Sequence, residues 1–298
     1  MIRTAVERFG LLIVSSPFRL LPRRGGLILA RWLGVLAYWM APGRRKIALK
    51  NLGIAYGEVK SSRERSSIAR KSFQNLFMNL SECLHLLSSD KDTIEDAISF
   101  TGEEHLKEAL SEGRGVLLVS AHIGNWELIC PALAHKGYLT AMIIKLSRNE
   151  TVNHYLVSYR ERMGVRVLRR RNVLGDCLKC LRDGGIVAFV SDMNARRSEG
   201  VFVPFFGREA CTLTSLALIA RKTGAPVVPV YAYRKGYANH AVIGTKVSHE
   251  TVADRGLDIL ERTRSYVSWS EDAIRQHPEQ WMWMIDRWKT RPKKEWSH

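Results

Sequence analysis

The sequence of 298 residues lacks the features of several large classes of protein. Its charge-free apolar runs, Phe9–Phe18 and Trp32–Gly43, are shorter than the roughly 18 to 20 residues that a membrane-spanning helix needs. Its five cysteines are odd in number and irregularly spaced, which argues against a disulfide framework and favours a reducing compartment. No small-residue cleavage site follows a short apolar core, so we expect no removable signal peptide.

Acidic residues are scarce in the first quarter of the chain, where 15 Lys or Arg stand against only Glu7, Glu58 and Glu64. With a net charge of +17 over the whole chain, this distribution predicts a polyanionic partner, either an anionic bilayer or a nucleic acid. Since the apolar runs lie in the same region, we expect residues 1–60 to form helices on an anionic membrane surface, with arginines at the headgroups. The alternative is a set of amphipathic core helices with solvated arginines.

Residues 61–298 have the pattern of an α/β domain, in which a mostly parallel central sheet is flanked by helices. The motif Ser61-Ser62-Arg63-Glu64 resembles a capping box and opens a helix that runs to about Leu87. The expected strands are Gly115–Ser120, Leu139–Ile144, Val165–Leu168, Ile186–Ser191 and Pro226–Tyr233, with an edge strand at Ala241–Val247. The expected helices run from the motif at 101–104 to about Gly113, over 126–136, 149–162, 172–183 and 212–223, and from about 255 onward.

Two polar residues follow expected strands directly and are candidates for a site. His122 comes just after the strand that ends at Ser120, and Asp192 just after the strand that ends at Ser191. Ligands of open α/β sheets bind at the carboxyl ends of the strands. If Gly124 permits a sharp bend, Glu127 in the first helical turn can reach back to His122 and orient it as a general base. The alternative is a capping histidine beside a glutamate that compensates the helix dipole.

A nucleophile supplied by the protein is poorly supported. The chain has no Gly-x-Ser-x-Gly motif, Ser120 is expected in its strand, and Cys130 is expected on a helix among apolar residues. Cys177 and Cys180 have no second pair of ligands at metal-binding spacing, so we expect neither a metal nor another cofactor. Direct activation of a substrate hydroxyl is the simpler scheme.

The segment 115–128, with His122 and Glu127 five residues apart, resembles the His-x4-Asp/Glu motif of the bacterial lipid A secondary acyltransferases. That lauroyl- and myristoyltransferase family, within the lysophospholipid acyltransferase superfamily, also includes phosphatidylinositol mannoside acyltransferases. The other blocks that resemble the family follow in order: an Arg-rich Asn-Leu block at 44–52, a central arginine segment at 159–164, Asp192 with 200–207 and 223–230, and a C-terminal signature at 278–292.

This resemblance implies transfer of a fatty acyl chain from acyl carrier protein, or from acyl-CoA, to a hydroxyl of a lipid A precursor or related membrane glycolipid. The implied place is the cytoplasmic face of an inner membrane, with peripheral attachment or a single N-terminal anchor. His122 would be the base that Glu127 orients, and Arg160, paired with Asp192, would stabilise the oxyanion. The expected substrate-binding residues are Asn125, Arg169, Arg170, Phe202, Phe205 and Phe206.

Several alternatives remain open from the sequence alone. Arg160 could equally be a solvated arginine on a helix instead of an oxyanion donor. The run Val201–Phe206 could equally be a core strand instead of the lining of an acyl-chain pocket. Trp281, Trp283 and Trp288 suit either a membrane interface or the packing of a terminal segment. A glycerophospholipid acyltransferase would use the same dyad. A basic nucleic-acid-binding protein would explain the net charge and the tract 169–171, but neither the dyad nor the ordered blocks, so we expect no nucleic-acid partner.

Overall fold

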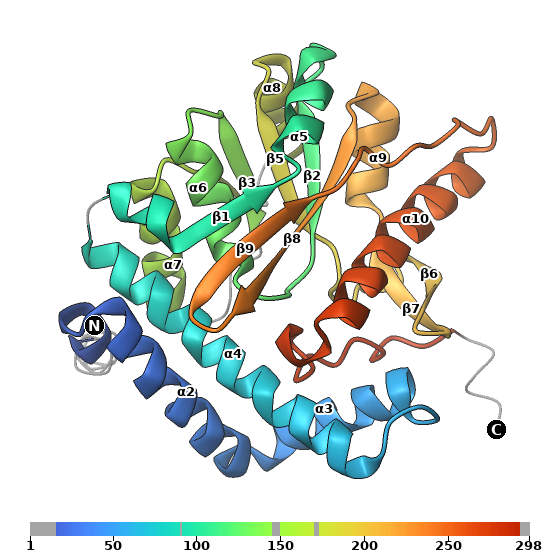
Figure 1. Ribbon diagram of the computed structural model, residues 1–298. Helices are drawn as coiled ribbons and strands as arrows, with labels where there is room; N and C mark the ends of the chain where they lie inside the picture. Colours follow the sequence, from blue (N-terminus) through green and yellow to red (C-terminus); the bar gives the residue numbers. More distant parts are fainter. Residues whose placement is uncertain (1–15, 90, 145–149, 170–172, 293–298) are drawn as a thin grey trace.

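The computed structural model describes residues 16–89, 91–144, 150–169 and 173–292. A seven-stranded sheet runs through its centre in the order β1-β9-β8-β2-β5-β3-β4 (Figure 1). All neighbouring strands of this sheet pair in parallel except β8 and β9, which are antiparallel, and β6 and β7 form a separate hairpin. The strands are β1 (Ile98–Thr101), β2 (Val116–Ser120), β3 (Thr140–Ile144), β4 (Arg166–Arg169), β5 (Ile186–Val190), β6 (Gly200–Phe205), β7 (Arg208–Leu213), β8 (Val227–Lys235) and β9 (Ala238–Ile243).

Helices cover both faces of this sheet. Because successive strand residues point to opposite faces, Val116 and Leu118 of β2 enter one core and Leu117 and Val119 the other. Helices α5, α6 and α7 contribute to the first core, and α8, α9 and α10 to the second. The helices are α2 (Arg23–Met40), α3 (Pro42–Tyr56), α4 (Ser62–Ser88), η1 (Lys91–Ala97), α5 (Glu103–Ser111), η2 (Trp126–Leu128), α6 (Ile129–His135), α7 (Glu150–Arg162), α8 (Val173–Arg182), α9 (Ser215–Thr223), α10 (Arg255–Gln276) and η3 (Pro278–Gln280).

The prediction of a mostly parallel sheet flanked by helices is confirmed, with three differences. The short strand β1 was not expected, and it occupies the edge of the sheet beside β9. The edge strand expected at Ala241–Val247 is therefore wrong in its bounds and in its position. The strand found there, β9, begins at Ala238 and has a neighbouring strand on each side. The strand β6 confirms the alternative of a core strand at Val201–Phe206, but its partner β7 was missed and occupies the start of the helix expected over 212–223.

The N-terminal helix α2 runs alongside α4 at one end of the molecule, and α3 packs against both (Figure 1). The expected capping box of α4 is confirmed, since Ser61 and Glu64 cap each other's backbone amides. Tyr38 and Leu52 are buried with residues of α4 and of the C-terminal segment in a shared core. The proposed boundary between two domains at residue 60 stays a prediction. Much of the apolar run Phe9–Phe18 lies outside the described residues.

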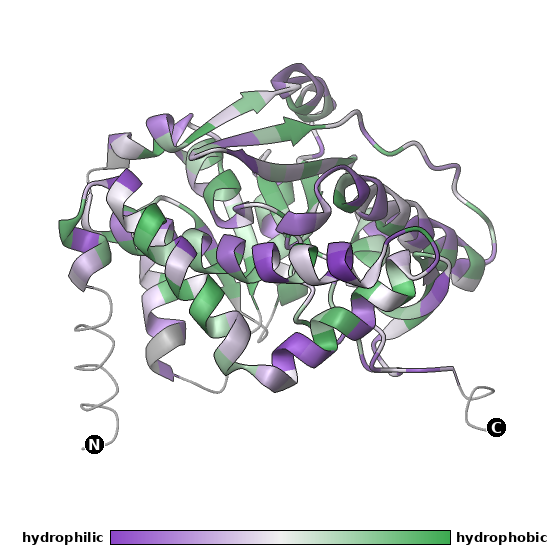
Figure 2. Cartoon of the chain, turned by 60° about the horizontal axis from the view of Figure 1, so that its bottom comes forward, coloured by the Kyte–Doolittle hydropathy of each residue, from purple (hydrophilic) through white to green (hydrophobic). Residues whose placement is uncertain are grey.

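The exposed face of α2 carries a row of large apolar side chains. Trp32, Leu36, Trp39 and Met40 are between 52% and 72% exposed, and Ile28 precedes them one turn earlier at 43%. Figure 2 looks onto the N-terminal helices and shows hydrophobic and hydrophilic residues side by side along them. Within the described parts of the chain, no helix combines the length and the apolarity that crossing a bilayer requires.

Three tryptophans near the C-terminus decide between a membrane-interface role and a packing role. Trp281, Trp283 and Trp288 are at most 2% exposed and pack with Phe205 and Phe206 of the hairpin. The interpretation of these residues as membrane-interface aromatics is therefore wrong, because interfacial side chains need an accessible surface. They pack the C-terminal segment against the domain.

Candidate active site

The site begins where β2 ends and the chain turns toward α6. Gly124 has a φ of 55°, in the left-handed region that glycine adopts without strain. A side chain here would also overlap the carbonyl oxygen of Ala232 on β8. The bend expected at this glycine is thus present, and it is followed by the short helix η2, on which Glu127 lies.

The acid that contacts His122 is Asp192, not Glu127 as the spacing suggested. Asp192 Oδ1 lies 2.7 Å from Nδ1 of the imidazole, and its Oδ2 accepts a hydrogen bond of 2.8 Å from the His122 amide. The indole of Trp281 donates to the same Oδ2 at 2.6 Å. An ionised carboxylate only accepts hydrogen bonds, so Nδ1 carries the proton and Nε2 is left with the lone pair.

Glu127 instead pairs with Arg160, which corrects the expected pairing of Arg160 with Asp192. Arg160 donates from Nε to Glu127 Oε2 at 3.0 Å and from Nη2 to Oε1 at 2.6 Å. Both side chains are nearly buried, and Trp126 donates a further bond to Glu127. The alternative of a solvated helix arginine at 160 is wrong, because this guanidinium is held in a two-point ion pair within the protein.

The four side chains form one electrostatic unit. Burial acts to lower the pKa of the His122 imidazole, but the Asp192 carboxylate, with help from Glu127, outweighs it and raises the pKa. Burial acts to raise the pKa of Asp192, but His122 and Trp281 hold it below its ordinary value. Although burial opposes it, Glu127 also raises the pKa of Arg160. The site therefore holds a histidine base with a raised pKa, an ionised carboxylate that orients it, and a permanently charged guanidinium.

The expected substrate-binding residues are more scattered. Asn125 has no exposed surface and donates to Glu82 at 2.7 Å, and its part in substrate binding stays a prediction. Phe205 and Phe206 are buried in the aromatic cluster, while Phe202 is half-buried beneath Arg197. Their part in an acyl-chain pocket stays a prediction. Arg170 and the side chain of Arg169 lie outside what the structure describes.

The cysteines do not supply a nucleophile to this site. Burial raises the pKa of Cys130 to about 12 and that of Cys83 well above its ordinary value. A thiol rather than a thiolate therefore persists at both positions near neutral pH, and a thiol is a poor nucleophile. Among the described residues, no group of three or more His, Cys, Asp or Glu is placed to hold a metal ion.

One contact of the candidate site was missed in the sequence, the hydrogen bond from Trp281 to Asp192. Trp281 follows Asp192 by 89 residues and does not end a strand, so neither spacing nor position in the sheet indicates it. Its segment is held at the site by a backbone pairing with Ile123. The only signal was that Trp281 lies in the C-terminal block that resembles the acyltransferase family.

Comparison with known proteins shows the family of the chain. Residues 3–290 match the family described as "Bacterial lipid A biosynthesis acyltransferase". The chain belongs to this family. It is 28% identical to the lipid A biosynthesis lauroyltransferase of Escherichia coli over 94% of this chain and 89% of that protein.

Two further relatives have different names. The lipid A biosynthesis myristoyltransferase of Escherichia coli is 23% identical over 89% of this chain and 80% of its own length. The phosphatidylinositol mannoside acyltransferase of Mycolicibacterium smegmatis is 26% identical over 70% of this chain and 67% of its own. Among solved structures, the 1-acyl-sn-glycerophosphate acyltransferase of Thermotoga maritima covers 83% of this chain and 97% of its own, with 14% identity and a TM-score of 0.37.

Proposed function

We propose that the protein transfers a fatty acyl chain from a thioester donor to a hydroxyl of a lipid A precursor or a related membrane glycolipid. The observation that carries the proposal is the His122–Asp192 pair at the carboxyl ends of β2 and β5, in a chain that belongs to the lipid A acyltransferase family. A histidine whose Nδ1 is held by a buried carboxylate presents Nε2 as a base, which is what activation of a hydroxyl needs.

In this mechanism, Nε2 of His122 takes the proton of the acceptor hydroxyl as its oxygen attacks the thioester carbonyl carbon. Asp192 holds the imidazole in the required tautomer and stabilises the imidazolium that forms. The tetrahedral intermediate then collapses, the C–S bond breaks, and the thiolate takes the proton back from Nε2. The products are an ester of the acceptor and the free thiol of the donor.

Arg160 is the candidate for stabilising the oxyanion of the tetrahedral intermediate. Its pair with Glu127 occupies Nε and Nη2, so the Nη1 edge of the guanidinium remains for another acceptor. A donor preorganised in this way stabilises charge that develops only in the transition state. Glu127 in this scheme orients Arg160, whereas Asp192 orients His122.

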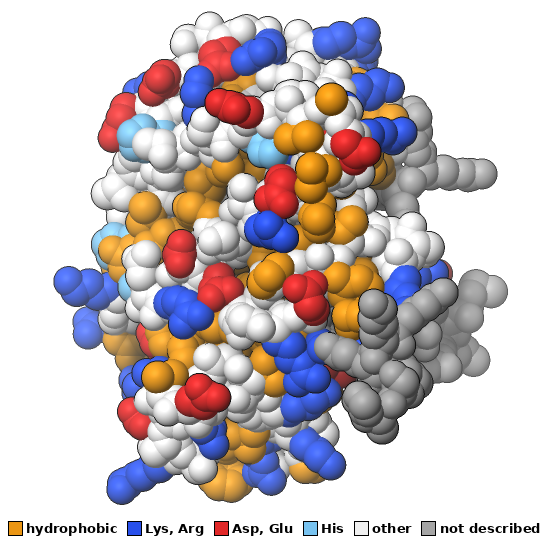
Figure 3. Space-filling view, turned by 90° about the vertical axis from the view of Figure 1, so that its right-hand side faces the viewer, with side chains coloured by type: hydrophobic (Ala, Val, Ile, Leu, Met, Phe, Trp, Pro, Cys, Tyr) orange, Lys and Arg blue, Asp and Glu red, His pale blue; other side chains and the backbone are white. Residues whose placement is uncertain are grey.

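The surface of the protein suits a lipid-bound acceptor. The apolar row on α2, from Ile28 to Met40, lies near Arg24, Arg31 and Arg44, a combination that suits an anionic bilayer. On the face in Figure 3, basic and acidic side chains are interspersed rather than gathered into one basic patch. From membership of the lipid A acyltransferase family, we infer attachment to the cytoplasmic face of an inner membrane, with an acyl carrier protein or acyl-CoA as donor.

The test is mass spectrometry of the lipids made by membranes with the wild-type protein, with His122→Ala or without the protein. We expect a lipid heavier by one acyl chain with the wild type alone, because a general base typically contributes about 10²- to 10⁴-fold to the rate. His85→Ala is a matched control outside the site. The new mass would identify the acceptor, and a glycerophospholipid product would replace the glycolipid assignment. Near-normal turnover by purified His122→Ala would refute the mechanism.

A further inference from the structure

Four buried polar side chains lie along one side of α4. Ser72, Asn75, Asn79 and Glu82 are each at most 7% exposed, and their spacing of three or four residues places them on one face of the helix. A buried helix face normally carries apolar side chains, because a buried polar group costs free energy unless it is hydrogen-bonded. We call these four residues the polar stripe of α4.

The first half of the stripe binds the backbone of the segment that contains Trp281. Ser72 donates from Oγ to the carbonyl oxygen of Trp281 and accepts a bond from the Trp283 amide. Asn75 donates to the carbonyl oxygen of Gln280 at 3.1 Å. These bonds hold the residue whose indole donates to Asp192.

The second half of the stripe binds the loop between His122 and Glu127. Asn79 and Asn75 both donate to the carbonyl oxygen of Gly124. Glu82 accepts a hydrogen bond of 2.7 Å from Nδ2 of Asn125. One helix thus contacts the backbone or side chains on both sides of the His122–Asp192 pair.

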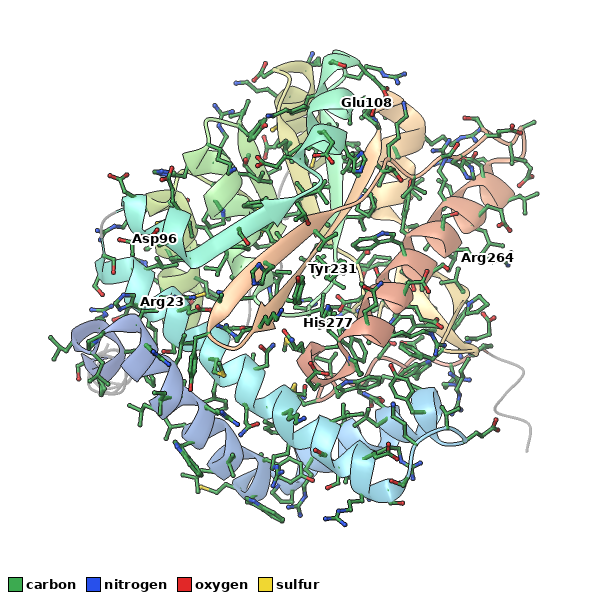
Figure 4. All side chains as sticks on the ribbon, in the orientation of Figure 1. Arg23, Asp96, Glu108, Tyr231, Arg264 and His277 are labelled. Atoms are coloured by element: carbon green, nitrogen blue, oxygen red, sulfur yellow. The ribbon has the colours of Figure 1, made fainter. Side chains whose placement is uncertain are left out.

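Glu82 is fixed in place from several directions. Its Oε2 accepts from Arg234 at 2.5 Å, and its Oε1 accepts from Arg23 Nε at 3.0 Å and from Asn239 at 2.9 Å. Burial opposes ionisation, but the arginines keep the pKa of Glu82 below its ordinary value, so a charged carboxylate faces Asn125. Arg23 begins α2 beside α4, as Figure 4 shows.

We propose that the polar stripe of α4 positions the loop between His122 and Glu127, which we call the catalytic loop, with Glu82 as a positioning residue that acts through Asn125. This inference rests on the proposed function. Placement of reacting groups within a fraction of an ångström is worth large factors in rate, and a misplacement of about 1 Å can cost about 10²-fold. A carboxylate held on both oxygens is a rigid reference point for the loop that carries His122.

The test compares two buried asparagines that each donate one hydrogen bond to Glu82. Asn125 lies in the catalytic loop, whereas Asn239 lies on β9 and otherwise donates to Ala97. We expect Asn125→Ala to lower kcat by about 10²-fold, with KM for donor and acceptor nearly unchanged. Asn239→Ala should keep kcat within about threefold, because Arg23 still donates to the same oxygen of Glu82. Both variants lose a buried hydrogen bond and some thermal stability.

A second readout needs no substrate. The nine histidines can be labelled with ¹³C, and the His122 signal assigned by its loss in His122→Gln. We expect Asn125→Ala to move the His122 titration to lower pH, because a displaced loop weakens the contact with Asp192, and Asn239→Ala to leave it in place. Absence of acyl transfer by the wild type would refute the proposed function, while the titration would still test the positioning.

Three results would overturn the inference. One is equal loss of kcat in the two variants, which would indicate a general effect on folding. Another is a rise in KM without a fall in kcat for Asn125→Ala, which would indicate direct substrate contact. The third is a His122 titration that neither variant changes. The folded fraction of each variant is measured by circular dichroism, and each kcat is expressed per folded molecule.

Discussion

At the scale of single residues, the central finding is which acid serves His122. The sequence places His122 and Asp192 correctly at the ends of two strands, and the register then decides their contact. Ser120 pairs with Val190 across β2 and β5, so residues two positions further on, 122 and 192, meet. This pairing was not predictable, because β3 and β4 intervene in the chain and the strand order is not visible in the sequence.

The role of Asp192 predicts a specific pH dependence. His122 accepts a proton only when it is neutral, and its pKa is raised, so wild-type kcat should increase with pH through a midpoint above the ordinary histidine pKa. Asp192→Asn removes the charge that raises this pKa, so the midpoint should move to lower pH. The plateau should also fall by about 10²- to 10⁴-fold, because the tautomer is no longer enforced.

Steady-state kinetics between pH 5 and 9 in detergent micelles measures both effects. Asp183→Asn, at an exposed aspartate after α8, is the matched control and should behave as the wild type. An acid limb that keeps the same midpoint in Asp192→Asn would show that His122 does not titrate under the influence of Asp192.

At the scale of helices and strands, sequence periodicity predicted the elements that are long or strongly patterned. Helix α4, with its capping box, and the buried strands β2 and β5 were placed within one or two residues. The strand β6 was left open as an alternative, and β7 was missed because its last residues also suit the start of a helix. The strand β1 was missed because four residues give too few alternations to detect.

Helix α2 carries the next prediction, which concerns its apolar row. Replacing Trp32 and Trp39 together by Glu should weaken binding to vesicles of phosphatidylethanolamine and phosphatidylglycerol by at least about tenfold. The reason is that both indoles are more than 60% exposed on one face, and burying each in the bilayer interface is worth more than about 1.4 kcal/mol.

Cosedimentation at low and high salt measures this binding. The double variant Leu174→Glu and Leu257→Glu is the control, since both leucines are 46% exposed but lie on α8 and α10. We expect salt alone to leave the wild type bound, because apolar burial adds to charge attraction. Unchanged binding of the tryptophan variant would place the attachment on another part of the chain.

At the scale of the whole molecule, the N-terminal helices and the α/β domain share buried structure. Asn51 of α3 donates to the carbonyl oxygens of Trp283 and Ile285, beyond the end of α10. Tyr56 packs edge-on against Phe206 of the hairpin. At the other end of α4, Arg23 of α2 supplies a charge that Glu82 needs. The sequence showed the change in composition near residue 60, but it does not show contacts between residues far apart in the chain.

We therefore predict that the two regions unfold together. A protease site placed in the turn Gly57–Lys60, and cut in the folded enzyme, should leave the fragments associated during gel filtration in mild detergent and largely active. Without the N-terminal fragment, the buried Glu82 would lose Arg23, one of its two arginine partners, and would keep Arg234, so the loss should destabilise the larger fragment. Thermal unfolding of the intact chain should accordingly follow one transition by circular dichroism. Separation of the cut fragments, with activity kept by the larger one, would instead establish residues 61–298 as an independent domain.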